Sequence, residues 1–218
     1  MEEEPTQEYS AQAMRARARQ LLAGHWKTAV ALSLSYGILL ALTMILRAKS
    51  MTMGLIATLI IGLIGVSLVY SFYSLVQADN DSETEVTLTW PGSLWLIGDS
   101  GRLGVNVMAY MLISIFTFFW TLLLIVPGII KALAYSQTYY ILADAQASGV
   151  EMSAMEAIKT SQQLMKGHKW EFFCLQLSFL GWMILAGLTF GIGWLWLGPY
   201  LSTTKACYYD YVASEADL

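Results

Sequence analysis

Long stretches without a charged residue constrain this chain more than any other feature. A membrane-spanning helix needs about 20 mainly apolar residues, and four uncharged runs cover 28–46, 51–78, 103–130 and 172–204. The third run is interrupted by Pro127-Gly128 and the fourth by a glycine-rich stretch at 189–194, so each contains parts of two helices. The runs therefore predict six helices, over 28–46, 52–78, 104–126, 129–147, 171–189 and 193–212.

The composition is that of a membrane protein. Of the 218 residues, 56% are hydrophobic and only 13% are charged, whereas soluble domains carry about 25% charged residues. No hydrophilic segment reaches the length of about 40 residues at which a domain begins to fold alone, so a separate catalytic domain is excluded. We predict a single membrane domain over 1–218.

A stretch of about 65 residues occurs three times. Shifting the chain by this period places Tyr70 on Tyr135 and then on Tyr200, and it places Gly128 on Gly193. Fixed-period similarity of this kind indicates a repeated structural unit, and transporter folds are often built from such units. We predict an all-α polytopic protein with six transmembrane helices arranged as three repeated hairpins, over 10–79, 86–148 and 151–212.

Each hairpin is preceded by a segment with amphipathic character, over 10–22, 86–104 and 153–167. Arg15 and Arg19 are one helical turn apart in the first segment, and Ser153 with Glu156 forms a capping-box signature in the third. Two interpretations stay open. These segments are either amphipathic helices at the inner leaflet or linker helices packed on the cytoplasmic face of the protein.

The distribution of Lys and Arg sets the orientation, because cytoplasmic loops carry the excess of positive charge. One predicted side carries Arg15, Arg17, Arg19, Lys27, Arg102, Lys159, Lys166 and Lys169, whereas the other carries only Arg47, Lys49 and Lys131. We therefore expect a multi-pass protein of the plasma membrane with both termini in the cytoplasm.

Polar side chains inside the spans are the candidate ligand-binding residues, because hydrocarbon offers them no water. They concentrate in the second helix of each hairpin: Tyr70, Tyr73, Gln77, Tyr135, Gln137, Thr138, Tyr200, Thr203 and Lys205. If the hairpins pack around a pseudo-threefold axis, these residues line an inward-opening cavity. The alternative is that they bond between helices, at about 0.6 kcal/mol each.

Charged residues in or near the spans raise a separate question. Lys205 either extends to the cytoplasmic interface, pairs with an aspartate (Asp79, Asp144 or Asp210), or binds a lipid phosphate. These aspartates lie near helix C-termini, where a carboxylate is disfavoured. We expect arginines of the amphipathic segments, namely Arg15, Arg19 or Arg102, to compensate them. A GxxxG pattern at 187–191 also predicts close helix packing.

No constellation for catalysis or metal binding stands out. The two histidines and two cysteines lack ligand spacing, and no hydrolase, zincin or P-loop motif occurs. Basic residues are sparse and close to the membrane, so nucleic-acid binding is not expected. We predict no catalytic residues, no metal and no cofactor.

Three strings carry a family resemblance: "LIVPGIIKALAYSQTYYILAD", "SAMEAIKTSQQLMKGHKWE" and "LTFGIGWLWLGPYLSTTKACYYDYV". They resemble the bacterial integral membrane proteins catalogued as domain of unknown function 975, which are distantly similar to the membrane domain of some glycerophosphodiester phosphodiesterases. The resemblance implies a fold and a bacterial membrane location. It implies no activity and no catalytic residue.

We therefore expect a non-enzymatic membrane protein that binds or passes a lipid-like or hydrophobic peptide ligand. The alternative is a scaffold or regulatory partner of another membrane complex, such as an exporter. The third hypothesis is an enzyme that acts on lipid headgroups. The expected partners are membrane lipids and either another membrane protein or further copies of this chain.

Overall fold

The computed structural model describes residues 10–80, 88, 103–123, 125–189 and 191–216, and these residues contain helices but no strand. The helices are α1 (Ala11–Leu22), α2 (Trp26–Lys49), α3 (Met51–Asn80), α5 (Leu103–Leu123), α6 (Ile125–Tyr135), α7 (Thr138–Ala147), α8 (Ala154–Leu164), α9 (Lys169–Leu177), α10 (Leu180–Leu188) and α11 (Trp194–Glu215). The all-α class is confirmed for the described part of the chain.

Four helical segments are long and apolar enough to cross a membrane. They are Trp26–Lys49, Met51–Asn80, Leu103–Thr121 and Lys169–Leu188, and the last includes both α9 and α10. Each coincides with one of the six predicted helices. The structure thus contains four candidate spans where the sequence predicted helices, which is consistent with a membrane protein, and the count of six stays a prediction.

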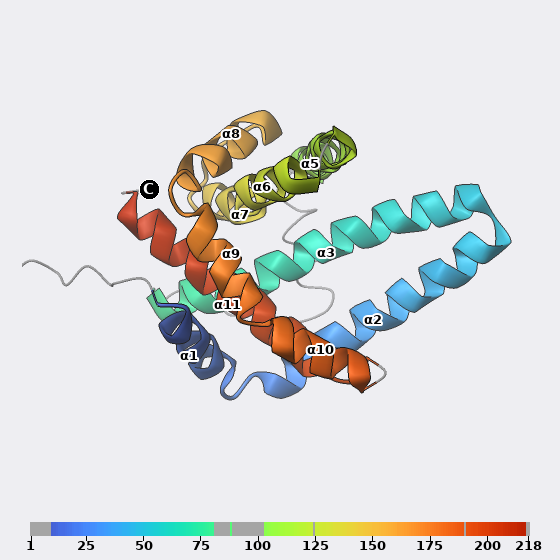
Figure 1. Cartoon of the computed structure of the whole chain (residues 1–218), viewed down its shortest axis with the longest axis horizontal. Helices are drawn as coiled ribbons and strands as arrows, with labels where there is room; N and C mark the ends of the chain where they lie inside the picture. The colour runs from blue at the N-terminus through green and yellow to red at the C-terminus, as the bar shows by residue number, and fades with distance from the viewer. Residues whose placement is uncertain (1–9, 81–87, 89–102, 124, 190, 217–218) are drawn as a thin grey trace, which may run out of the picture.

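Consecutive helices lie side by side in pairs: α2 packs against α3, α5 against α6, and α10 against α11. In Figure 1, the turn between α2 and α3 lies at one extreme of the molecule, whereas α1 and the end of α11 lie at the other. Helix α11 also crosses α3, and α3 contacts α7. Helix α3 therefore meets both α11, the second helix of the third pair, and α7, which follows α6 in the chain.

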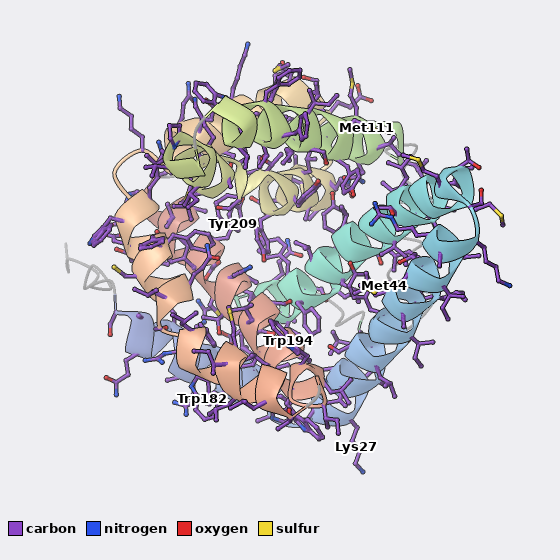
Figure 2. All side chains as sticks on the ribbon, turned by 45° about the vertical axis from the view of Figure 1, so that its right-hand side comes forward. Lys27, Met44, Met111, Trp182, Trp194 and Tyr209 are labelled. Atoms are coloured by element: carbon purple, nitrogen blue, oxygen red, sulfur yellow. The ribbon has the colours of Figure 1, made fainter. Side chains whose placement is uncertain are left out.

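The candidate spans expose their apolar side chains outward (Figure 2). Met44 on α2 is 74% exposed, Met51 on α3 is 78% exposed, and Phe118 on α5 is 64% exposed. Large apolar side chains exposed along the length of several helices are unusual in a soluble monomer. In a membrane it faces lipid acyl chains, so the exposure agrees with the assignment of these helices as spans.

The predicted helix over 129–147 is broken into α6 and α7, and a side chain from α8 accounts for the break. Ser161 Oγ donates to the carbonyl oxygen of Ala134 at 2.8 Å and accepts from the backbone N–H of Gln137 at 3.3 Å. A side chain that inserts into the hydrogen-bond ladder is a recognised cause of helix kinks. Because Ser161 is far away in the sequence, the break was not visible in the local pattern.

The predicted capping box at the start of α8 is confirmed. The backbone N–H of Ser153 donates to Glu156 Oε2 at 2.8 Å, and Ser153 Oγ accepts from the backbone N–H of Glu156 at 3.3 Å. Helix α1 also forms where the first amphipathic segment was predicted. Of the second predicted segment, 86–104, the structure describes residues 88, 103 and 104, and the rest lies outside the described residues.

Replacing Ser153 with alanine is expected to destabilise the start of α8 by about 1 kcal/mol, because one cap acceptor is lost. The loss of stability would be measured as faster amide hydrogen exchange in α8 of the variant. Hydrogen bonds from the Ser153 side chain and backbone hold the pKa of Glu156 below its ordinary value of 4.5. The stabilisation of the start of α8 by the Glu156 carboxylate is therefore fully present above pH 4.5, and it is lost as the pH falls through the lowered pKa of Glu156. Unchanged exchange in the variant would contradict a working cap.

A glycine lies at a close backbone approach in each helix pair. A Cβ on Gly54 would lie 2.8 Å from the Arg47 Cα, one on Gly128 would lie 2.9 Å from the Thr121 Cα, and one on Gly193 would lie 2.7 Å from the Ala186 Cα. In all three cases the partner is seven residues earlier in the chain. These distances are too short for a side chain, so glycine lets each second helix fold back closely on the first.

Candidate functional site

Three tyrosines from three helices form the centre of the polar interior. Tyr73 of α3, Tyr140 of α7 and Tyr209 of α11 have ring centroids 5.3 to 5.8 Å apart, and Figure 2 shows Tyr209 in the interior. The hydroxyl groups of Tyr73 and Tyr209 both donate to the Asp144 carboxylate, each at 3.3 Å. Asp144 thus accepts from two tyrosines, and among the described residues neither Arg15 nor Arg19 forms an ion pair with it.

The other two helix-end aspartates share a single arginine. Arg17 Nη1 donates to Asp210 Oδ2 at 2.7 Å, and Arg17 Nη2 donates to Asp79 Oδ2 at 3.0 Å. Asn80 completes the group, since its side chain donates to Asp210 Oδ1 at 2.6 Å. Burial acts to lower the pKa of Arg17, but the hydrogen bonds and charges of the aspartates raise it above its usual value. This ion cluster ties α1 to the ends of α3 and α11.

The expectation that Arg15 or Arg19 would compensate these aspartates was wrong, and Arg102 lies outside the described residues. Helix α1 buries Met14 and Ala18. With about 100° between successive residues, Arg17 lies at one edge of that buried stripe, whereas Arg15 and Arg19 lie at the opposite edge. The prediction identified the right segment and charge but the wrong face of the helix.

Lys205 projects into a cavity of about 560 Å³. The walls come from α3, α6, α7, α9, α10 and α11, and most of them are apolar or aromatic: Val69, Ile129, Ala132, Leu133, Tyr139, Tyr140, Phe172, Phe173, Leu177, Leu180 and Met183. The other polar lining residues are Ser136 and Gln176. Since Ile129, Leu177 and Leu180 are about half exposed, the cavity opens onto the apolar outer surface.

Lys205 has no carboxylate within salt-bridge distance and no hydrogen bond in the part of the chain described above. None of the three predicted aspartate partners reaches it, because Asp79 and Asp210 bind Arg17 and Asp144 binds the tyrosines. A cation in apolar surroundings loses hydration that only an anion or water can replace. The cavity thus combines one positive charge with a long apolar wall.

The comparison with known families matches a large part of the chain. A family model described as "protein of unknown function (DUF975)" matches residues 104–216. The chain belongs to this family. The matched DUF975 region contains every residue that lines the Lys205 cavity except Val69. No curated protein and no solved structure matches the chain. The more distant resemblance to glycerophosphodiester phosphodiesterases stays a prediction.

The nine predicted site residues do not share one environment in this DUF975 protein. Lys205 lines the cavity described above, and Tyr200 lines a second cavity beside α1. Tyr70 instead donates to Asn106 Oδ1 at 2.6 Å, and Thr138 donates to the carbonyl oxygen of Tyr135 at 2.8 Å. Bonding within and between helices, the alternative interpretation, thus describes these contacts.

The remaining predicted residues are packed inside or beside the interior. Tyr73 belongs to the tyrosine centre, and the Tyr135 ring lies 6.2 Å from that of Phe116. Gln137 and Thr203 are fully buried, and Gln137 Oε1 and Thr203 Oγ1 have no hydrogen-bond partner among the described residues. Gln77 is half-buried near the end of α3. Whether any of them binds a ligand stays a prediction.

Sequence reasoning missed Tyr140, Tyr209 and Arg17 as members of the polar interior. Tyr209 is the residue that falls on Asp144 when the chain is shifted by about 65 residues. The repeat therefore pointed to position 209, because it is equivalent to Asp144. It was overlooked because the residue there is a tyrosine and not an acid. Tyr140 falls on Leu75 and on Lys205, so the repeat gave no indication of its role.

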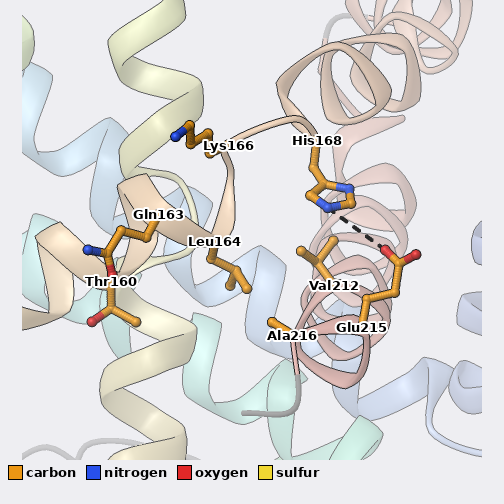
Figure 3. A pocket seen from close by; sticks show the side chains of 8 residues that line it. All are labelled: Thr160, Gln163, Leu164, Lys166, His168, Val212, Glu215 and Ala216. Atoms are coloured by element: carbon orange, nitrogen blue, oxygen red, sulfur yellow. Dashed lines mark ion pairs between the residues drawn. The ribbon is translucent and has the colours of Figure 1, made fainter.

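A third cavity, of about 480 Å³, lies between α8 and the end of α11 (Figure 3). His168 faces two glutamates there: its Nδ1 lies 3.0 Å from Glu171 Oε2, and its Nε2 lies 3.8 Å from Glu215 Oε2. The hydroxyl of Tyr208 donates to the carbonyl oxygen of His168 at 2.9 Å. These bonds fix the loop before α9 against α11, which is a structural role.

Proposed function

We propose that this protein is a non-enzymatic, multi-pass protein of the bacterial plasma membrane that binds a lipid-like ligand in the Lys205 cavity. The observation that carries the proposal is the Lys205 ammonium, which has no partner among the described residues, in a cavity with largely apolar walls. An amphiphile with an anionic head would pair with the ammonium and place its chain along the aromatic and aliphatic side chains. Ligand sites commonly combine apolar walls with a few polar groups in this way.

The proposal includes six spans in three repeated hairpins with both termini in the cytoplasm. The glycine contacts at Gly128 and Gly193, which are 65 residues apart, support the repeat of the second and third pairs, whereas Gly54 of the first pair lies outside that register. Helix α1 and the end of α11 lie at the same end of the molecule (Figure 1), as an even number of spans requires. The excess of Lys and Arg on that side supports a cytoplasmic location.

Changing Lys205 to methionine is expected to abolish the preference for an anionic amphiphile while leaving the apolar wall intact. In neutral detergent, oleate should bind the unmodified protein at least about tenfold more tightly than oleyl alcohol, a difference of about 1.4 kcal/mol. The variant should bind both equally. Isothermal titration with the two probes provides the measurement.

The matched control is Lys27→Met, which removes an exposed lysine at the start of α2 (Figure 2). It should keep the preference for oleate. Equal binding of the two probes by the unmodified protein, or an undiminished preference in Lys205→Met, would contradict the proposal.

The second candidate function is that of a scaffold or regulatory partner for another membrane complex. The observation in its favour is the apolar outer face of α2, where Ile38 is 60% exposed and Met44 is 74% exposed. Substituting both with serine would then abolish co-purification with that complex, or with further copies of this chain, whereas Lys205→Met would not.

A further inference from the structure

A second open cavity, of about 550 Å³, lies between α1 and the α10–α11 pair. Arg15 and Arg19 line it from α1, and three tryptophans line it from other elements: Trp26 at the start of α2, Trp182 on α10 and Trp196 on α11. Trp182 and Trp196 are each more than half exposed. The cavity is therefore open on its aromatic side.

Both arginines direct their charge to this cavity and not to the ion cluster. Arg15 Nε donates to the carbonyl oxygen of Ala11 at 3.2 Å, and its guanidinium lies 6.0 Å from the Phe179 ring centroid. Among the described residues, no carboxylate lies within salt-bridge distance of either guanidinium. Two positive charges one helical turn apart thus share a site with no carboxylate partner from the described part of the chain, in contrast to Arg17 on the opposite edge of α1.

The chemistry of the cavity changes along its length. At the α1 end are the two guanidinium groups, which bind phosphate oxygens in a fork of parallel hydrogen bonds. Toward α10 and α11 the lining becomes apolar, with Leu185 and Leu197 beside the tryptophans. Tryptophan is enriched where membrane headgroups meet acyl chains. A charged head with an apolar chain fits this gradient, whereas a free phosphate would leave the apolar half unused.

We infer that this cavity binds an anionic phospholipid, with its phosphate held by Arg15 and Arg19 and an acyl chain along Trp182 and Trp196. The bound lipid would fix α1 to the bilayer surface and against α11. This site shares α10 and α11 with the Lys205 cavity but has no lining residue in common with it, and it does not depend on the function proposed for that cavity.

The test is a native mass spectrometry titration of the purified protein in neutral detergent. Dioleoyl phosphatidylglycerol should bind at least about tenfold more tightly than dioleoyl phosphatidylcholine. In a Lys205→Met background, which removes the cation of the other cavity, the double variant Arg15→Gln/Arg19→Gln should lose this preference. The control variant Arg47→Gln/Lys49→Gln removes the same charge from the far end of α2, where both residues are exposed, and should keep it, as should Lys205→Met.

Three outcomes would overturn the inference. The first is equal affinity of the unmodified protein for the two lipids. The second is an undiminished preference in the glutamine variant. The third is displacement of phosphatidylglycerol by inorganic phosphate at equal concentration, which would indicate an anion site without lipid recognition. If the glutamine variant does not fold, Arg15→Lys/Arg19→Lys replaces it. That variant keeps both charges but loses the fork, so its preference should fall at least about threefold, and an unchanged preference would equally overturn the inference.

Discussion

Replacing Gly128 or Gly193 with alanine is expected to destabilise the protein by about 1–3 kcal/mol each, the usual cost of overpacking. The new Cβ would lie 2.9 Å from the Thr121 Cα in the first case and 2.7 Å from the Ala186 Cα in the second. Backbone atoms cannot rotate away as a side chain can, so the helix pair must open. Reversible unfolding in mixed micelles, followed by tryptophan fluorescence, would measure the change.

The matched controls are Gly37→Ala in α2 and Gly181→Ala in α10, because nothing lies within 4 Å of a Cβ at either position. Alanine has the higher helix propensity by up to about 1 kcal/mol, so these variants should be neutral or slightly more stable. Equal behaviour of Gly128→Ala and Gly181→Ala would contradict the close packing of α5 with α6.

Replacing Arg17 with glutamine is expected to cost about 2 kcal/mol, between the values for exposed and buried ion pairs. The expected cost lies between the two because the cluster is partly exposed. The Arg17 side chain is 25% exposed, that of Asp210 is 24% exposed and that of Asp79 is 46% exposed. Without the guanidinium, two carboxylates are left together at helix C-termini. The same micelle unfolding experiment measures the loss.

A double-mutant cycle separates the ion cluster from other effects of the substitution. Arg17→Gln and Asp210→Asn should be non-additive by about 1 kcal/mol or more, because each removes the same contact. Arg19→Gln serves as the control on the same helix, since Arg19 is exposed and has no ion pair among the described residues. Additive effects of Arg17→Gln and Asp210→Asn would show that the two side chains do not interact.

Hydropathy and length predicted the helices well, because a bilayer imposes both directly on the sequence. The predicted helix over 28–46 lies within α2, and the one over 52–78 lies within α3. The local signature of Ser153 and Glu156 likewise predicted the start of α8, since a capping box involves only neighbouring residues. Features set by contacts within a few residues were therefore accessible from the sequence.

Features set by tertiary contacts could not be predicted from the sequence. The break between α6 and α7 depends on Ser161, and the environment of Lys205 depends on helices from most of the chain. The GxxxG pattern at 187–191 did not mark close packing, because nothing lies within 4 Å of a Cβ on Gly187 or Gly191. The glycines that do permit close approach, such as Gly128, follow the turns between paired helices. The repeat related Gly128 to Gly193 but did not reveal that contact.

The most direct measurement of the proposed function is a structure determined in lipid nanodiscs and examined at the Lys205 cavity. We expect elongated density along the Phe172 and Leu180 wall, with a polar end within hydrogen-bonding distance of Lys205 Nζ. A cavity filled by the protein's own side chains, with Lys205 turned to the membrane surface, would contradict it.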